Sequence, residues 1–349
     1  MILVVLELLL YICSMQLLFS FIIPVYNRPN ETEELLESFS NQDAVIDYEI
    51  VVVEDGSIES SEAVVKKFNQ ELNISYYFKE NSGPGASRNY GMQKAKGNYF
   101  IILDSDCILP KNYLTEVKKN LQTNYVDCFG GPDAAHASFS NLQKAINFSM
   151  TSFISTGGIR GHKKSVNTFQ PRSFNMGLSR TAFEATHGFG RIHPGEDPDL
   201  AIRLWNLGFK TAFFESVYVY HKRRISWSKF YKQVNKFGMV RPILNTWHPD
   251  TRKITYWFPT VFMLGFFFSI LAAFLGITMP LFLIFCYYIL VFIIALVQTK
   301  SLAVAFQSLI AITIQFFGYG IGFFKSTFFV GILNRNPEQH FPKLFFKSK

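Results

Sequence analysis

The sequence predicts an α/β domain with a mainly parallel, doubly wound sheet, followed by a C-terminal α-helical membrane region. Two observations predict this order. From residue 19 to residue 103, short apolar runs alternate with segments of helical pattern, which is typical of parallel sheets covered by helices. Beyond residue 245, long stretches carry almost no charge. We therefore divide the 349 residues into an apolar N-terminal segment (1–18), an α/β domain (19–245) and a membrane region (246–349).

The α/β domain is expected to begin with four strands joined by three helices. The apolar runs predict strands at 19–23, 48–53, 74–78 and 99–103, and the segments between them predict helices at 31–40, 59–70 and 85–95. A further strand is predicted at 216–220. Ligands of such sheets bind beyond the carboxyl ends of the strands. Asp55, Asp104 and Asp106 lie just past two of these ends, so they are candidate site residues.

The N-terminal segment is apolar but contains Glu7, and it runs into the first strand without a linker. A spanning helix needs about 20 residues, and no basic region or cleavage site marks a secretory signal. We expect either a docking helix or a misassigned start, with Met15 as the true initiator.

The membrane region contains three apolar segments, at 256–277, 281–298 and 303–324. Each approaches or reaches the length that crosses a bilayer. The third segment contains Gly318, Gly320 and Gly322, and these glycines permit a broken or re-entrant segment. A re-entrant third segment would keep the basic C-terminal tail in the cytosol, as the positive-inside tendency favours.

The formal charge of +8 is concentrated just before the membrane segments. Seven Lys and Arg residues lie between Lys222 and Arg241, with no acid among them. Anionic headgroups or a lipid-linked diphosphate suit this position better than nucleic acid, so we expect no nucleic-acid partner. Apolar residues from Trp227 to Phe237 recur at helical spacing, which fits either a helix in the membrane interface or an ordinary packed helix. The four cysteines show neither zinc-site nor disulfide spacing, which favours a reducing compartment.

The triplet Asp104-Ser105-Asp106 follows the predicted strand 99–103. Two carboxylates at i and i+2 at a strand end can face one hard cation, and Mg²⁺ or Mn²⁺ held in this way keeps positions open for phosphates. The turn after the first strand, 24–30, contains no glycine, which argues against a dinucleotide-binding enzyme.

Four segments together resemble the family 2 glycosyltransferases of the GT-A fold, over roughly residues 18 to 240. They are Pro24-Val25-Tyr26-Asn27, Val53-Glu54-Asp55-Gly56-Ser57, Ala86-Ser87-Arg88-Asn89-Tyr90-Gly91 and Leu103-Asp104-Ser105-Asp106. The resemblance implies a nucleotide-sugar donor, with a UDP-sugar favoured, and inversion at the anomeric carbon. It also implies a divalent cation (Mg²⁺ or Mn²⁺) bound by Asp104 and Asp106. The donor-binding residues would be Pro24, Tyr26, Asp55, Arg88, Asp104 and Ser105.

The acceptor side of the resemblance rests on Glu196-Asp197, at the start of a predicted helix. By matching position Asp197 is the catalytic base and Glu196 hydrogen-bonds the acceptor; helix capping is the alternative use of these acids. His221 would complete the metal shell, although a lone histidine is more often structural. The segments 157–164 and 175–177, together with Arg172, are candidates for lining the acceptor or phosphate side.

The expected function is that of a membrane-bound inverting glycosyltransferase of the inner membrane, with its catalytic domain on the cytoplasmic face. It would move one sugar to a membrane-proximal acceptor, such as a lipid-linked saccharide, in envelope polysaccharide or glycoconjugate synthesis. The motif Q-x-x-R-W of processive relatives is absent, since residues 223–227 read Arg-Arg-Ile-Ser-Trp, which favours single additions. The alternatives are a polyprenyl-phosphate sugar transferase and a non-catalytic, sugar-nucleotide-binding membrane scaffold.

Overall fold

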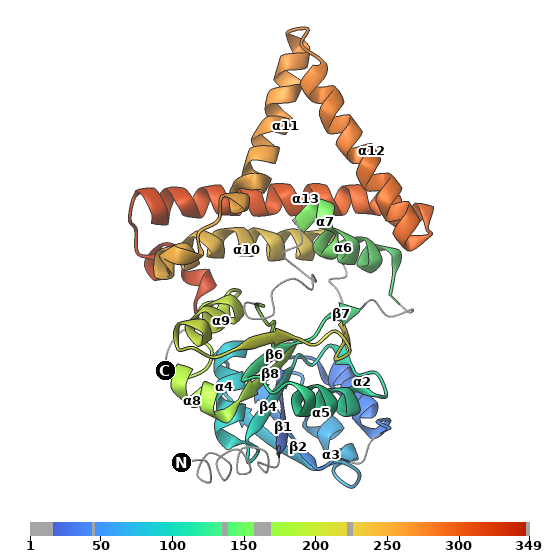
Figure 1. The fold of residues 1–349 in the computed structure, drawn as a ribbon, viewed down its shortest axis with the longest axis vertical. Coiled ribbons are helices and arrows are strands. Elements are labelled where there is room, and N and C mark those ends of the chain that lie inside the picture. The colour runs from blue at the N-terminus through green and yellow to red at the C-terminus, as the bar shows by residue number, and fades with distance from the viewer. Residues whose placement is uncertain (1–16, 44–45, 135–138, 157–168, 222–225, 347–349) are drawn as a thin grey trace, which may run out of the picture.

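The computed structural model has an α/β unit at one end and a unit of long helices at the other (Figure 1). It describes residues 17–43, 46–134, 139–156, 169–221 and 226–346. Nearly all of the apolar N-terminal segment, the stretch 157–164 and the basic residues 222–224 therefore lie outside the described residues.

The α/β unit is built on one seven-stranded sheet, in the order β3-β2-β1-β4-β8-β6-β9. These strands are β1 (Phe19–Val25), β2 (Tyr48–Asp55), β3 (Ile74–Lys79), β4 (Tyr99–Leu103), β6 (Cys128–Gly130), β8 (Asn175–Ser179) and β9 (Thr211–Phe213). β8 runs antiparallel to both of its neighbours, and the other pairs are parallel. The predicted mainly parallel, doubly wound sheet is confirmed.

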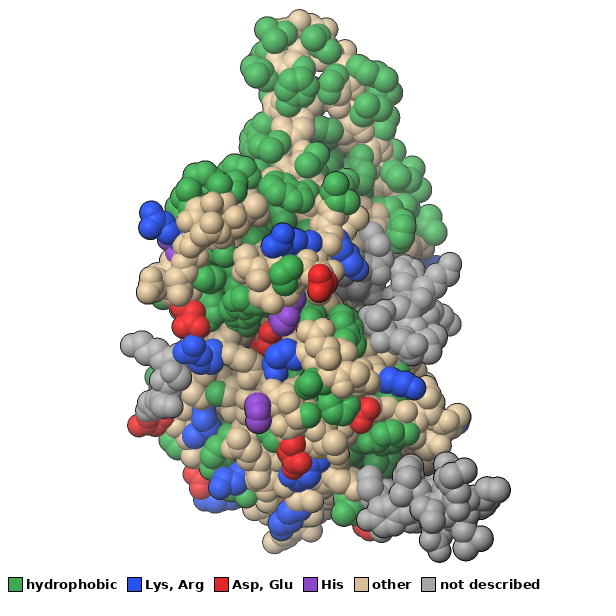
Figure 2. Space-filling model, turned by 60° about the vertical axis from the view of Figure 1, so that its left-hand side comes forward, with side chains coloured by type: hydrophobic (Ala, Val, Ile, Leu, Met, Phe, Trp, Pro, Cys, Tyr) green, Lys and Arg blue, Asp and Glu red, His purple; other side chains and the backbone are tan. Residues whose placement is uncertain are grey.

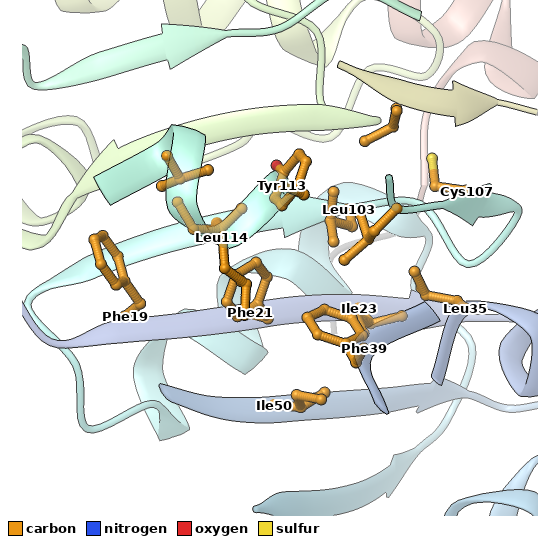
Figure 3. Packing of buried hydrophobic residues seen from close by; sticks show 14 of the residues in the cluster. Phe19, Phe21, Ile23, Leu35, Phe39, Ile50, Leu103, Cys107, Tyr113 and Leu114 are labelled. Atoms are coloured by element: carbon orange, nitrogen blue, oxygen red, sulfur yellow. The ribbon is translucent and has the colours of Figure 1, made fainter. Parts of the chain in front are cut away.

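Helices cover both faces of this sheet, because alternate strand residues point to opposite sides. Phe21 and Ile23 of β1 pack with α2 (Pro29–Ser40), α3 (Glu62–Phe68) and α5 (Tyr113–Thr123), as Figure 3 shows for α2 and α5. Ile22 faces the other side, which is covered by α4 (Pro84–Lys94), α8 (Arg180–Thr186) and α9 (Glu196–Asn206). The Phe21 and Phe39 rings meet edge to face at 4.9 Å. Burial on both faces explains why the strands read as continuous apolar runs.

A small second sheet lies beyond the carboxyl end of β4. It consists of β5 (Cys107–Ile108), β10 (Val219–His221) and β7 (Asp133–Ala134), in the order β5-β10-β7. His221 pairs with Cys107 in this sheet. The short sheet thereby brings the end of β10 next to the Asp104–Asp106 turn.

The helical unit consists of a platform and a hairpin. The platform is formed by α6 (Asn141–Thr151), α7 (Phe153–Thr156), α10 (Trp227–Trp247) and α13 (Leu302–Ser326), and the hairpin by α11 (Phe258–Phe274) and α12 (Met279–Thr299). α10 and α13 lie side by side, and the hairpin stands away from them (Figure 1). Short turns η1 (Pro249–Thr251) and η2 (Ile254–Trp257) join α10 to the hairpin.

Three helical stretches are long and apolar enough to cross a membrane: Ile254–Phe274, Met279–Thr299 and Leu302–Ile332. They correspond to the three segments predicted from the sequence. Figure 2 shows the hairpin covered by apolar side chains, whereas charged side chains gather over the rest of this face.

α13 is a continuous helix, so the break that its glycines permit does not occur. The glycines instead allow other elements to approach closely. A Cβ on Gly322 would lie 2.3 Å from the carbonyl oxygen of Asn235 in α10, and one on Gly320 would lie 2.9 Å from the Pro259 carbonyl oxygen in α11. Small residues at helix interfaces commonly serve this purpose in membrane proteins.

The chain ends by returning to the α/β unit. After the π-helical turn η3 (Thr327–Ile332), the segments α14 (Pro337–His340) and η4 (Pro342–Leu344) lead to Phe346. The His193 backbone N–H donates to the Leu344 carbonyl oxygen at 2.7 Å, and the Phe346 N–H donates to the Arg191 carbonyl oxygen at 3.1 Å. The C-terminal segment therefore contacts the loop that precedes α9.

The close approach at Gly322 generates a stability prediction. We expect Gly322→Ala to destabilise the protein by about 1–3 kcal/mol. The added methyl group would clash with backbone atoms of α10, and no side-chain movement can relieve that clash. Gly265→Ala in α11 is the matched control, since a Cβ there meets nothing within 4 Å. Thermal unfolding in detergent checks both variants, and equal melting temperatures for them would contradict the proposed packing role.

Candidate functional site

One large cavity, of about 1620 Å³, lies between the carboxyl ends of the strands and the helical platform. All ten residues that the sequence singled out for donor, metal or catalytic roles line it. They are Pro24, Tyr26, Asp55, Arg88, Asp104, Ser105, Asp106, Glu196, Asp197 and His221. They come from six separate places in the chain, so the fold assembles them.

Arg88 occupies the centre of this arrangement. Its side chain is buried, its Nη2 lies 2.8 Å from Asp104 Oδ1, and its Nη1 lies 3.2 Å from Glu196 Oε1. Burial lowers the pKa of Arg88, but Asp104 and Glu196 raise it by more, so the guanidinium remains charged. Arg88 thus links the predicted donor side to the predicted acceptor side.

Asp106 and His221 converge at one end of the cavity. His221 Nε2 lies 3.1 Å from Asp106 Oδ1, and the imidazole stacks on Phe174 at 4.9 Å. Asp106 also forms an ion pair with Arg28. Burial raises the pKa of Asp106, but His221 and Arg28 lower it by more, which keeps the carboxylate ionised.

The ligand atoms of Asp106, Cys107 and His221 lie close enough to hold one metal ion. The Cys107 thiol is an unsuitable ligand, because burial raises its pKa well above the ordinary value and its Sγ is 3.4 Å from the Phe174 carbonyl oxygen. The carboxylate and the imidazole remain, and both are ligands that Mn²⁺ accepts. The predicted third ligand, Asp104, is turned towards Arg88.

Asp55, the last residue of β2, organises the loop at the edge of the cavity. Its carboxylate accepts hydrogen bonds from the backbone N–H groups of Ser82 and Gly83, both at 2.9 Å, and from Lys79 Nζ at 2.5 Å. Asp55 is buried and still lines the cavity. With these hydrogen bonds, Asp55 holds the loop of Ser82 and Gly83 in place.

Glu196 and Asp197 are neighbours in sequence whose carboxyl groups differ in acidity. Burial raises the pKa of Glu196, but His193 and Arg88 lower it by more, to about 2. Burial and the Glu196 charge raise the pKa of Asp197 to about 6, against smaller opposing effects of Arg88 and Arg172. Asp197 Oδ1 is buried and has no hydrogen-bond partner among the described residues. A carboxyl group with these properties is suited to accepting a proton near neutral pH.

No side chain caps α9, whose N-cap is Gly195. Glu196 and Asp197 nevertheless lie in its first turn, where the helix dipole favours negative charge, so the structural alternative for these acids stays open.

The prediction for residues 175–177 is wrong. They form part of β8 and are buried, and they do not line the cavity. Asn175 accepts a hydrogen bond from the Tyr113 hydroxyl and donates one to the Val217 carbonyl oxygen, both at 2.7 Å. Arg172, by contrast, lines the cavity.

The sequence did not single out Arg28, His193 or Arg241 as site residues. Arg28 lies in the turn after β1, beside the end of β4, and its only signal was a basic side chain at a strand end. His193 Nδ1 lies 2.9 Å from Glu196 Oε1. Arg241 is brought to the cavity by α10, far from the motifs in sequence.

The helical platform forms the other wall of the cavity. Lys229, Lys232 and Lys236 of α10 line it, whereas Phe230 and Val234 are buried against α6 and α13. The apolar face of α10 is therefore packed against other helices, as the ordinary packed-helix alternative expects. Residues of the hairpin and of α13 also line the cavity; they are Phe258, Pro259, Tyr287, Gln315 and Tyr319.

Comparison with known proteins identifies the α/β unit. Residues 20–186 match the model of glycosyl transferase family 2. The chain carries a family 2 glycosyltransferase domain. This agrees with the four sequence segments that resemble the family.

Curated relatives of this chain include the following two proteins. An uncharacterized glycosyltransferase of Rickettsia bellii (strain RML369-C) is 39% identical over 105 residues, which are 30% of this chain and 15% of the relative. The chondroitin synthase of Escherichia coli is 42% identical over 89 residues, which are 25% of this chain and 13% of the relative. The matches thus span less than a sixth of the length of either relative.

A solved structure supports the fold. The mannosyltransferase of Pyrobaculum calidifontis, in complex with GDP-Man and Mn²⁺, aligns with a TM-score of 0.51 and 18% identity, over 65% of this chain and 63% of that chain. At this identity the similarity concerns the fold alone, which is GT-A-like.

The buried position of Arg88 leads to a second stability prediction. Arg88→Met should destabilise the protein by about 3–5 kcal/mol, because it leaves the charges of Asp104 and Glu196 uncompensated. The matched control is Arg191→Met, which removes an exposed ion pair with Glu338 and should cost about 1 kcal/mol or less. Thermal unfolding of both variants in detergent is the measurement; an Arg88 variant as stable as the control would contradict this prediction.

Proposed function

We propose that this protein is a membrane-associated inverting glycosyltransferase that moves one sugar from a nucleotide-sugar donor to a membrane-proximal acceptor. The observation that carries the proposal is the single cavity, which is lined both by the family 2 motifs and by residues of the apolar helices. A lipid-linked saccharide fits this position, and the relationship to a chondroitin synthase agrees with polysaccharide or glycoconjugate synthesis.

The donor is assigned to the end of the cavity formed by β1, β2 and β4. Pro24, Tyr26 and Asp55 would contact the nucleotide, with a UDP-sugar favoured, and Arg88 and Ser105 would lie towards the diphosphate. Asp106 and His221 would hold Mn²⁺ or Mg²⁺, with Asp104 as a further ligand once it leaves Arg88. The cation would neutralise charge on the diphosphate when the donor is bound.

Asp197 is assigned as the catalytic base. The acceptor hydroxyl gives its proton to Asp197 as its oxygen bonds to the anomeric carbon, and the bond from that carbon to the diphosphate oxygen breaks. Attack from the face opposite the leaving group inverts the configuration. Glu196, which stays ionised, would accept a hydrogen bond from the acceptor and hold Arg88 in place. Intact acids of this kind argue against a non-catalytic scaffold.

We propose that the α11–α12 hairpin crosses the inner membrane and returns, with the catalytic domain on the cytoplasmic face. No charged residue occurs between Lys253 and Lys300, and a helix of 21 residues such as α12 is about 30 Å long, the thickness of the hydrocarbon core. α13 packs along α10, and the segment that follows contacts the catalytic domain. Two crossings therefore keep both ends of the membrane region on one side, in agreement with the positive-inside tendency.

The assignment of Asp197 predicts the pH dependence of transfer. Because the base must be deprotonated, kcat/KM should rise about tenfold per pH unit below the Asp197 pKa of about 6 and level off above it. Asp197→Asn should lower kcat by about 10² to 10⁴ and leave donor binding intact. Asp250→Asn, at an exposed acid on η1, is the control. Steady-state transfer assays check this, and an Asp197→Asn variant with wild-type kcat would overturn the assignment.

The cation assignment predicts that loss of a metal ligand weakens nucleotide binding. This can be measured without an acceptor. UDP should bind more tightly with Mn²⁺ than with a chelator, and Asp106→Asn should remove that difference, because it deletes a carboxylate ligand. Isothermal titration with the purified protein measures it, again with Asp250→Asn as the control. Cation-dependent binding that persists in Asp106→Asn would show that the ion lies elsewhere.

A further inference from the structure

Two arginines line the same cavity as Asp197 without the ion pairs that hold the other arginines of the site. Arg172 precedes β8, and Arg241 is on α10. Arg28 and Arg88 each pair with an acid, but neither Arg172 nor Arg241 forms an ion pair with any acid of the described residues. Both residues are half-buried, and charges that are partly removed from water are normally paired, because desolvation is costly.

Arg241 is held in place by its surroundings, yet one N–H group of its guanidinium has no hydrogen-bond acceptor among the described residues. Its guanidinium lies over the Tyr256 ring, 4.6 Å from the centroid. Its Nη1 is buried and makes no hydrogen bond among the described residues. A charged donor fixed in this way, in the wall of a cavity, is a ready partner for an anion.

Arg172 is close enough to interact with both Arg241 and Asp197. Burial lowers the pKa of Arg172, the Asp197 charge raises it, and the Arg241 charge lowers it. Two like charges placed together are stabilised by a shared anion. An arginine guanidinium has the geometry for bidentate hydrogen bonds to phosphate oxygens.

We propose that Arg172 and Arg241 bind a phosphate group of the acceptor on the membrane side of Asp197. The inference rests on the proposed function and adds the chemical class of the acceptor, a lipid phosphate. Lys229, Lys232 and Lys236 extend the positive wall along α10. Tyr256, Tyr287 and Tyr319, from η2 and the apolar helices, line the same cavity, so the lipid chain can leave towards the hairpin.

The test is a binding titration with the full-length protein in detergent. The probe is farnesyl phosphate, a short lipid phosphate, and farnesol is its neutral counterpart. Arg172→Gln and Arg241→Gln should each weaken farnesyl phosphate binding about tenfold or more, because each removes a hydrogen bond from a charged donor, and leave farnesol binding unchanged. Arg335→Gln, at an exposed arginine outside the cavity, should change neither. Farnesyl phosphate binding that is equal in wild type and both variants would overturn the proposal.

Conservative variants keep the test valid if a Gln variant is misfolded. If either Gln variant melts early, Arg172→Lys and Arg241→Lys take its place. They keep the charge but lose the bidentate geometry, and they should bind farnesyl phosphate several-fold more weakly than wild type does. Wild-type affinity in both Lys variants would again overturn the proposal.

The two sources of the phosphate are separated by a second probe, farnesyl-diphosphate-linked N-acetylglucosamine. Arginine-dependent binding of this probe supports a lipid-linked saccharide acceptor, and arginine-dependent binding of farnesyl phosphate alone supports a bare lipid phosphate. Arginine-dependent binding of a soluble acidic oligosaccharide, without either lipid probe, would contradict a lipid acceptor. UDP binding is measured in parallel: its absence from wild type would contradict the proposed function, while the arginine-dependent lipid binding would still stand.

Discussion

The arrangement of the site depends on one buried guanidinium. Arg88 links Asp104, at the carboxyl end of β4, to Glu196, at the start of α9. Several carboxylates share this cavity, and without a central cation their mutual repulsion would oppose burial. The same charge, together with the larger effect of His193, lowers the pKa of Glu196, whereas burial and the Glu196 charge raise the pKa of Asp197 to about 6 against the opposing effect of Arg88. One buried charge therefore lies between the proposed donor side and the proposed base.

The second constraint is the attachment of the helical unit to the start of α9. Asp199 Oδ1 lies 2.9 Å from Nε2 of His248, which follows α10. The C-terminal segment pairs with the loop that precedes α9 through a β-bridge between Ile192 and Phe345. The start of α9 is thus held between the sheet and the helical unit. On the proposed function, this attachment would let one cavity serve a soluble donor and a membrane-bound acceptor.

The parts that the sequence predicted well are those specified by local patterns. Continuous apolar runs identified the central strands, and short motifs at strand ends and helix starts identified ten of the residues that line the cavity. The errors arose where a residue's role depends on contacts with distant segments. Gly318 and Gly322 suggested a break, but α10 packs against them. Arg28 and Arg241 could not be assigned, because no pattern shows which strand end or cavity they reach. Asn175 was assigned to a ligand site, but it hydrogen-bonds within the core.

The most direct test of the account is nucleotide release from a panel of nucleotide sugars by the detergent-purified protein. Reactions contain Mn²⁺, Mg²⁺ or a chelator, with or without an extract of membrane lipids. The account predicts that one nucleotide is released, only with a divalent cation, and faster when the lipid extract is present. Absence of cation-dependent release from every donor, together with absence of cation-dependent nucleotide binding, would contradict it.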